Sequence, residues 1–180
     1  MPPSPTAEAA LLARALDLDP HALGQIHDEF YPEIYRYALY RVGDSEVAAD
    51  IAADVFLRLL DTLHAGRPPQ TTLRGWLFGV AAHRVADHWR APHATVVLPD
   101  DLADTRSVAG EVEERLRRGE VQAALRRLTD DQQQILALRF GDGFSVEESA
   151  TVMGKTVTAV KALQFRALEA LRRHLGVNHD

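Results

Sequence analysis

Residues 92–110 separate two stretches of sequence in which apolar residues recur at the spacing of an α-helix. This separating stretch holds two prolines, three aspartates and no periodic pattern, as is typical of a linker. Alternation of apolar and polar residues, the mark of a strand, is not found in the chain. The sequence therefore predicts an all-α protein with two small helical domains joined by a flexible linker.

The first domain is expected at residues 19–91, after a loose tail at residues 1–18. The tail begins with three prolines and leaves room for a short helical piece at its end. Asp19 and Pro20 form a helix start, because aspartate caps helices and proline fits their first turn. A loop is expected at residues 64–72, which hold a glycine and two prolines. The helices of this domain are expected at about 20–42, 45–63 and 73–90.

The second domain, residues 111–176, ends in a helix-turn-helix pattern. Ser145 and Glu148 form a capping box that starts a short helix, and Gly154 ends it. A longer helix follows, so a short helix, a tight turn and a long helix stand in the order that DNA-binding proteins use. The helices are expected at about 111–127, 130–140, 146–153 and 157–175.

The last helix is basic, although the whole chain has a net charge of −6. Residues 155–175 hold five Lys and Arg side chains against Glu169 alone. Lys, Arg and Thr on such a helix can reach base edges and phosphates in the major groove. The alternative is an amphipathic bundle helix with a solvated basic face.

An acidic row marks the second helix of the first domain, where Glu46, Asp50 and Asp54 recur every four residues. Like charges at this spacing cost about 0.2–0.5 kcal/mol per pair in an isolated helix. A basic protein partner would explain the row, and a plain solvated face would explain it equally well.

Composition excludes several kinds of site. The chain has no cysteine, which rules out disulfides, thiolate zinc sites and a cysteine nucleophile. His83, His88 and His93 are spaced by five and do not share a helical face, so neither a metal nor another cofactor is expected. No catalytic constellation is found, and we expect a protein that is not an enzyme. No apolar run reaches the ~20 residues of a membrane span, and no signal peptide is seen, which predicts a soluble, cytoplasmic protein.

Two blocks of the sequence resemble the bacterial sigma-70 family, in its extracytoplasmic-function (ECF, group IV) branch. The block from FYPEIYRYALYRVGDSEVAADIAADVFLRLL through LRGWLFGVAAHRVADHWR resembles region 2 of that family. The block LRRLTDDQQQILALRFGDGFSVEESATVMGKTVTAVKALQFRALEALRRHL resembles region 4. The resemblance implies a sigma factor that directs core RNA polymerase to promoters and assists promoter melting. A helix-turn-helix regulator that acts without core polymerase is the alternative, and it leaves the first block unexplained.

The resemblance also implies partners and site residues. The partners are core polymerase, through the β′ clamp helices and the β subunit, promoter DNA, and an anti-sigma factor; insertion into a membrane is not implied. The docking candidates for core polymerase are Asp50, Asp54, Phe56 and Leu57. The loop at 64–72 resembles the family's specificity loop, and the −10 candidates are Thr72, Trp76, His83, Arg84, Trp89 and Arg90. The −35 candidates are Thr156, Thr158, Lys161, Phe165 and Arg166.

The recognition helix departs from the family pattern. The family usually has VKSRLxRAR at this place, and this chain has VKALQFRAL. Ala162, Leu163 and Leu168 replace a serine and two arginines, which removes phosphate contacts from the −35 surface. His83 stands where the family often has asparagine, and Ala53 and Asp54 stand where it often has Gln-Glu.

Overall fold

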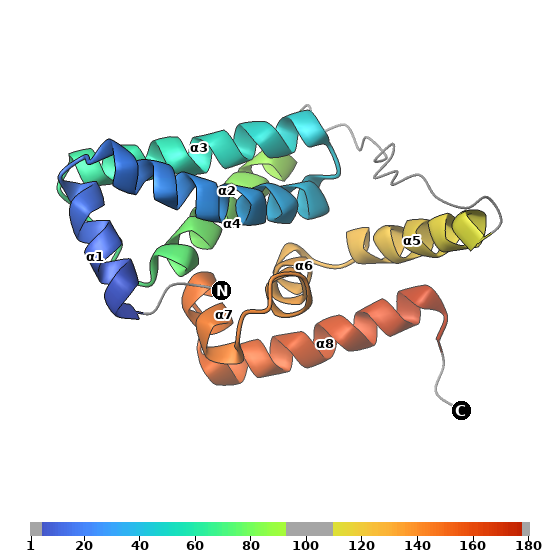
Figure 1. Cartoon of the computed structure of the whole chain (residues 1–180). Helices are drawn as coiled ribbons and strands as arrows, with labels where there is room; N and C mark the ends of the chain where they lie inside the picture. Colours follow the sequence, from blue (N-terminus) through green and yellow to red (C-terminus); the bar gives the residue numbers. More distant parts are fainter. Residues whose placement is uncertain (1–4, 93–109, 178–180) are drawn as a thin grey trace. The chain divides into compact units, whose positions relative to one another are not determined.

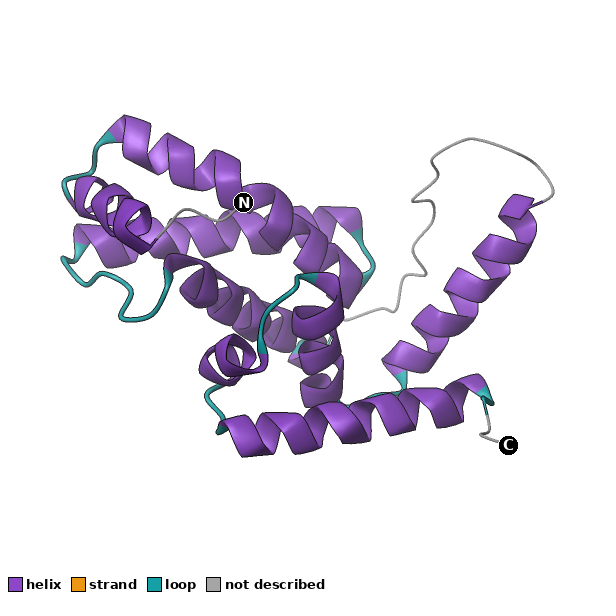
Figure 2. Cartoon of the chain, turned by 60° about the horizontal axis from the view of Figure 1, so that its bottom comes forward, coloured by secondary structure: helices purple, strands orange, loops and turns teal. Residues whose placement is uncertain are grey.

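The computed structural model describes residues 5–92 and 110–177, and within these ranges every regular element is a helix. The predicted all-α class is confirmed. The chain divides into two compact units, one built on α1–α4 and the other on α5, α6, η1, most of α7, and α8 (Figure 1). Figure 2, coloured by secondary structure, shows the same helices and their connecting loops. Nearly all of the predicted linker, residues 93–109, lies outside the described residues.

The helices predicted at about 20–42, 45–63 and 73–90 begin at the residues that the sequence signals indicate. The Asp19 side chain accepts from His21 N, and the Asp44 side chain accepts from Glu46 N at 2.9 Å. Gly43 ends the second helix in the left-handed conformation, with φ 74°, which glycine adopts without strain. The four helices are α1 (Pro5–Leu16), α2 (Pro20–Val42), α3 (Ser45–His64) and α4 (Leu73–Arg90).

Helix α1 is longer than the short helical piece that the sequence allows at the end of a loose tail. It has 12 residues, and its Ala15 side chain is completely buried. Its Glu8 carboxylate accepts a hydrogen bond from Leu73 N, 65 residues away, at 2.7 Å. Proline does not prevent this helix, because Pro5 is the first residue of α1, where proline is tolerated, and the alanines and leucines that follow favour a helix.

The core of the first unit lies between α2, α3 and α4. Buried residues on α2 recur every four positions and face the other two helices. Arg41 is also buried and donates through Nη1 to the Tyr37 hydroxyl at 3.0 Å. The largest buried apolar side chains are Ile26, Phe30, Ile34, Leu63, Leu73, Leu77 and Phe78.

In the second unit, the helix predicted at 130–140 is divided. The α-helix ends at Leu136, and a π-helical turn follows, closed by a hydrogen bond from Asp142 N to Ala137 O at 3.0 Å. Four consecutive residues, 135–138, span the junction of the α-helix and the π-helical turn, and all four are buried. The elements are α5 (Gly110–Arg126), α6 (Asp130–Leu136), η1 (Ala137–Gly141), α7 (Val146–Met153) and α8 (Val157–Leu175).

None of the helices in the described part of the chain is both long enough and apolar enough to cross a lipid bilayer.

Candidate functional sites

The acidic row on α3 is exposed at one end and paired at the other. Glu46 and Asp50 are exposed, whereas Asp54 is half-buried and forms an ion pair with Arg84 of α4. The distance from Asp54 Oδ2 to Arg84 Nε is 3.1 Å, and Arg84 Nη1 lies 3.6 Å from Asp87 Oδ2. Asp54 and Arg84, predicted for two different surfaces, therefore contact each other in the free chain.

The two apolar docking candidates on α3 lie in different environments. Leu57 is 57% exposed, whereas Phe56 is only 9% exposed. The Phe56 ring lies 5.0 Å from the His27 ring and 6.0 Å from the Tyr31 ring of α2. Leu57 is thus available to a partner, and Phe56 supports the packing of α2 against α3.

An aromatic row on α2 was missed by the sequence reasoning. Its members are His27, Tyr31 and Tyr35, spaced by four residues on one side of the helix. The His27 and Tyr31 rings are 4.9 Å apart and the Tyr31 and Tyr35 rings are 6.3 Å apart, both stacked. The spacing is visible in the sequence, but it also fits a buried face. Only the fold shows that Tyr31 and Tyr35 are half-buried and that the Tyr31 ring lies beside Phe56 of α3.

Three of the −10 candidates lie on one face of α4, because Trp76, His83 and Arg90 are spaced by seven residues. His83 and Arg90 are exposed and Trp76 is half-buried. Arg84 lies to one side, where it pairs with Asp54. The half-buried Trp89 contacts the neighbouring His88 ring edge-on at 5.1 Å.

The sixth −10 candidate, Thr72, is the N-cap of α4. Its hydroxyl accepts from Gly75 N at 3.1 Å. A Cβ atom at residue 75 would come within 2.9 Å of the Thr72 hydroxyl, so glycine is needed there to keep the cap. In the preceding loop, Pro69 is buried, while Gln70 and Thr71 are exposed.

The helix-turn-helix has the caps and the turn that the sequence predicts. Ser145 and Glu148 satisfy each other's backbone N–H groups at 2.7 and 3.0 Å. Gly154 adopts φ 62° in the turn, and the Thr156 hydroxyl accepts from Ala159 N at 3.2 Å at the start of α8.

Helix α8 presents all of its −35 candidates to solvent. Thr156, Thr158, Lys161, Phe165 and Arg166 are exposed, and the opposite face is buried through Val160, Leu163, Ala167 and Ala170. Phe165 is 66% exposed, so its ring is accessible beside the basic side chains of this face. Two cations of the basic segment are paired: Lys155 with Asp131 at 3.0 Å and Arg172 with Glu169 at 2.7 Å.

Arg139 fixes the position of α8 and was also missed. Its Nε donates to the Gln164 side chain at 3.0 Å, and its Nη1 donates to Phe144 O. It comes from the π-helical turn, which the sequence does not signal, so its reach to α8 could not be foreseen.

Across residues 5–92 and 110–177, no three His, Asp or Glu side chains come together in the way that a metal ion requires.

Comparisons with known proteins agree on one family. Two family models match the chain: Sigma-70 region 2 over residues 26–94, and Sigma-70, region 4 over residues 124–173. The ECF RNA polymerase sigma factor SigD of Mycobacterium tuberculosis is 33% identical over 183 residues, covering 95% of this chain and 85% of SigD. The ECF sigma factor BldN of Streptomyces coelicolor is 35% identical over 170 residues, covering 92% of this chain; the chain spans 64% of that longer relative.

The fold has solved counterparts. The structure of CnrH in complex with the cytosolic domain of CnrY superposes with a TM-score of 0.73 at 22% identity, covering 96% of this chain and 99% of that one. RpoE of Bartonella quintana, solved with the anti-sigma factor NepR, gives a TM-score of 0.65 at 19% identity over 87% of this chain and 98% of that one. Both likenesses concern the fold. The two family matches and the relatives at 33% and 35% identity establish that the chain belongs to the ECF group of the sigma-70 family, the non-enzymatic RNA polymerase subunits of transcription initiation.

Proposed function

We propose that this sigma factor uses three separate surfaces: the exposed side of α3 for core polymerase, loop 64–72 with α4 for the −10 element, and α8 for the −35 element. One observation carries the assignment. The residues expected to contact DNA on α8 are all exposed, while the opposite face of the same helix is buried. A helix built in this way can enter the major groove without losing its own core.

Core polymerase would bind α3 through Asp50 and Leu57. Both side chains are exposed and lie seven residues apart, on the same face. A carboxylate beside an exposed leucine suits a basic partner with an apolar anchor, because charge steers the encounter and apolar burial holds the complex. Asp54 is half-buried and its Oδ2 is paired with Arg84, so it presents less free carboxylate to a partner than Asp50 does.

The −10 element would bind at the loop and the α4 face that holds Trp76, His83 and Arg90. Unpaired bases stack on aromatic rings and their phosphates bind cations, so a tryptophan, a histidine and an arginine on one face suit a melted strand. Exposed Gln70 and Thr71 supply hydrogen-bonding groups for an extruded base.

The −35 element would bind α8 through Thr158, Lys161 and Arg166, with Phe165 against a thymine methyl group or a protein partner. No ion pair of the described residues involves Lys161 or Arg166, which leaves both cations for phosphate or base contacts.

An anti-sigma protein is the regulatory partner that we propose, acting in the cytoplasm. RpoE of Bartonella quintana, which shares the fold, was solved with the anti-sigma factor NepR. Such a protein would cover the exposed polymerase-binding side of α3 and compete with core polymerase.

Run-off transcription with purified core polymerase tests this function. The full-length chain is expected to give initiation that depends on core and on promoter sequence. Asp50→Lys is expected to raise the concentration needed for half-maximal initiation roughly five-fold, since exposed interface charges contribute modestly. Glu120→Lys, an equal charge change on exposed α5, is the control.

Two results would count against the proposal. DNA binding without core-dependent initiation would favour a regulator that acts alone. Wild-type affinity of Asp50→Lys for core would remove α3 from the docking surface.

A further inference from the structure

We propose that helix α1 holds loop 64–72 in its DNA-reading conformation, and that Glu8 is the positioning residue. This inference rests on the proposed role of the loop in reading the −10 element. It assigns a structural role to α1, which lies within the segment that the sequence alone suggests is a loose tail.

Glu8 contacts the chain where the loop ends. Its Oε1 accepts from Leu73 N at 2.7 Å, and Leu73 is the first residue of α4. The first N–H groups of a helix have no partner within the helix, and a carboxylate there also interacts favourably with the helix dipole. Thr72 satisfies Gly75 N, so Thr72 and Glu8 together cap the start of α4.

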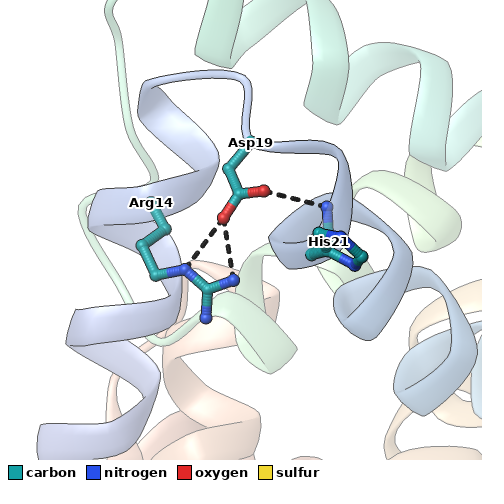
Figure 3. Close-up of polar contacts among 3 residues, drawn as sticks. All are labelled: Arg14, Asp19 and His21. Atoms are coloured by element: carbon teal, nitrogen blue, oxygen red, sulfur yellow. Dashed lines mark hydrogen bonds and ion pairs between the residues drawn. The ribbon is translucent and has the colours of Figure 1, made fainter.

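The other end of α1 is fixed as well. Arg14 donates from Nε and Nη2 to Asp19 Oδ2 at 2.9 and 2.8 Å, as Figure 3 shows. Asp19 Oδ1 accepts from His21 N, so the same carboxylate caps α2. The Arg14 hydrogen bond and the His21 backbone hydrogen bond lower the pKa of the Asp19 carboxyl, which keeps the pair ionised.

Helix α1 therefore connects the start of α4, through Glu8, with the start of α2, through Arg14 and Asp19. It packs against α2 and α3, and Figure 1 shows it lying across the end of the α2–α3 pair, where α3 ends and α4 begins. The first part of the loop is held by Arg67 N, which donates to Thr62 O at 2.9 Å. Its last part, residues 70–72, is exposed and depends on the start of α4 for its position.

Base recognition is sensitive to such positioning, because contacts to an extruded base need their partners within a fraction of an ångström. Losing the Glu8 cap would let the first turn of α4 fray and the tip of the loop move. The effect should fall on the −10 element alone, since α8 belongs to the other compact unit.

The test compares holoenzymes made from core polymerase and full-length variants. A promoter is first selected with the wild-type holoenzyme and then varied base by base in its −10 and −35 elements. The variants are Glu8→Ala, Glu8→Gln, which keeps an accepting oxygen, and Glu8→Asp, which is too short to reach Leu73 N. Glu120→Ala on exposed α5 is the matched control.

Glu8→Ala and Glu8→Asp are expected to reduce discrimination among −10 sequences about five-fold and to leave −35 discrimination unchanged. Glu8→Gln should keep most of the −10 discrimination. If Glu8→Ala does not fold, the −10 discrimination of Glu8→Asp tests the role of Glu8.

Wild-type −10 discrimination in Glu8→Asp, or equal losses at both elements, would overturn the role of Glu8. Failure of the wild-type holoenzyme to initiate would refute the proposed function instead, so the two failures are distinguishable.

Discussion

At the scale of single residues, the ion pair between Asp54 and Arg84 shows what sequence can and cannot predict. The spacing of residues on α3 predicts that Asp54 belongs to an acidic row. It does not predict that Arg84, thirty positions later, takes this carboxylate at 3.1 Å, because that contact depends on how α3 packs against α4. The same limit applies to Phe56 and Leu57, adjacent residues of which only Leu57 is exposed.

The pairing leads to a prediction for the free chain. Asp54→Asn removes one of the two carboxylates paired with Arg84 and should raise the affinity of the free chain for single-stranded DNA about two- to three-fold, because an arginine with fewer carboxylate partners binds phosphate better. Fluorescence anisotropy with a labelled oligonucleotide at low salt measures this change.

Asp50→Asn is the matched control for that measurement. It changes the net charge equally, but Asp50 is exposed, and the ion pairs of Arg84 go to Asp54 and Asp87 instead. An equal rise in single-stranded DNA affinity in both variants would mean that total charge, and not the loss of the Asp54 contact to Arg84, sets this affinity.

At the scale of elements, the structure confirms the helices whose ends have a chemical signal. Asp19 caps α2 as predicted, and Asp44 and Thr72 cap α3 and α4 at the predicted helix starts, since a cap depends on residues next to it in sequence. Helix α1 and the π-helical turn differ from the prediction because distant contacts support them. Glu8 reaches Leu73, and four consecutive buried residues follow from packing.

The turn between α7 and α8 allows a prediction about stability. Gly154 has φ 62°, where an L-residue with a Cβ is strained, so Gly154→Ala should lower the free energy of unfolding by about 1 kcal/mol. Gly119 lies inside α5, and a Cβ added there would meet no atom within 4 Å. Gly119→Ala should therefore raise the free energy of unfolding by roughly 0.5–1 kcal/mol. Urea denaturation followed by circular dichroism measures both.

The opposite signs make these two variants controls for each other. A stabilising Gly154→Ala would mean that the turn does not need the left-handed conformation.

At the scale of the whole molecule, charge is divided by location. The chain has a net charge of −6, yet α8 presents Lys161 and Arg166 on an exposed face. The acidic groups include Glu46 and Asp50 on the exposed side of α3. A negative total opposes binding of the free chain to a polyanion, and under the proposed function the basic face of α8 would bind DNA only after core polymerase places it on a promoter.

This division predicts a specific dependence on salt. At physiological salt the free chain should bind promoter duplex far more weakly than the holoenzyme does, and an equal affinity would contradict the idea that the acidic total suppresses stray binding.

In the holoenzyme, Arg166→Ala should weaken binding similarly at all sequences and reduce the slope of log K against log salt by about one, the amount expected for one lost phosphate contact. Arg172→Ala, whose guanidinium is already paired with Glu169 at 2.7 Å, is the control and should leave the slope unchanged. If Arg166→Ala instead loses affinity only for promoters with one particular base in the −35 element, Arg166 reads that base, because a phosphate contact carries no sequence information.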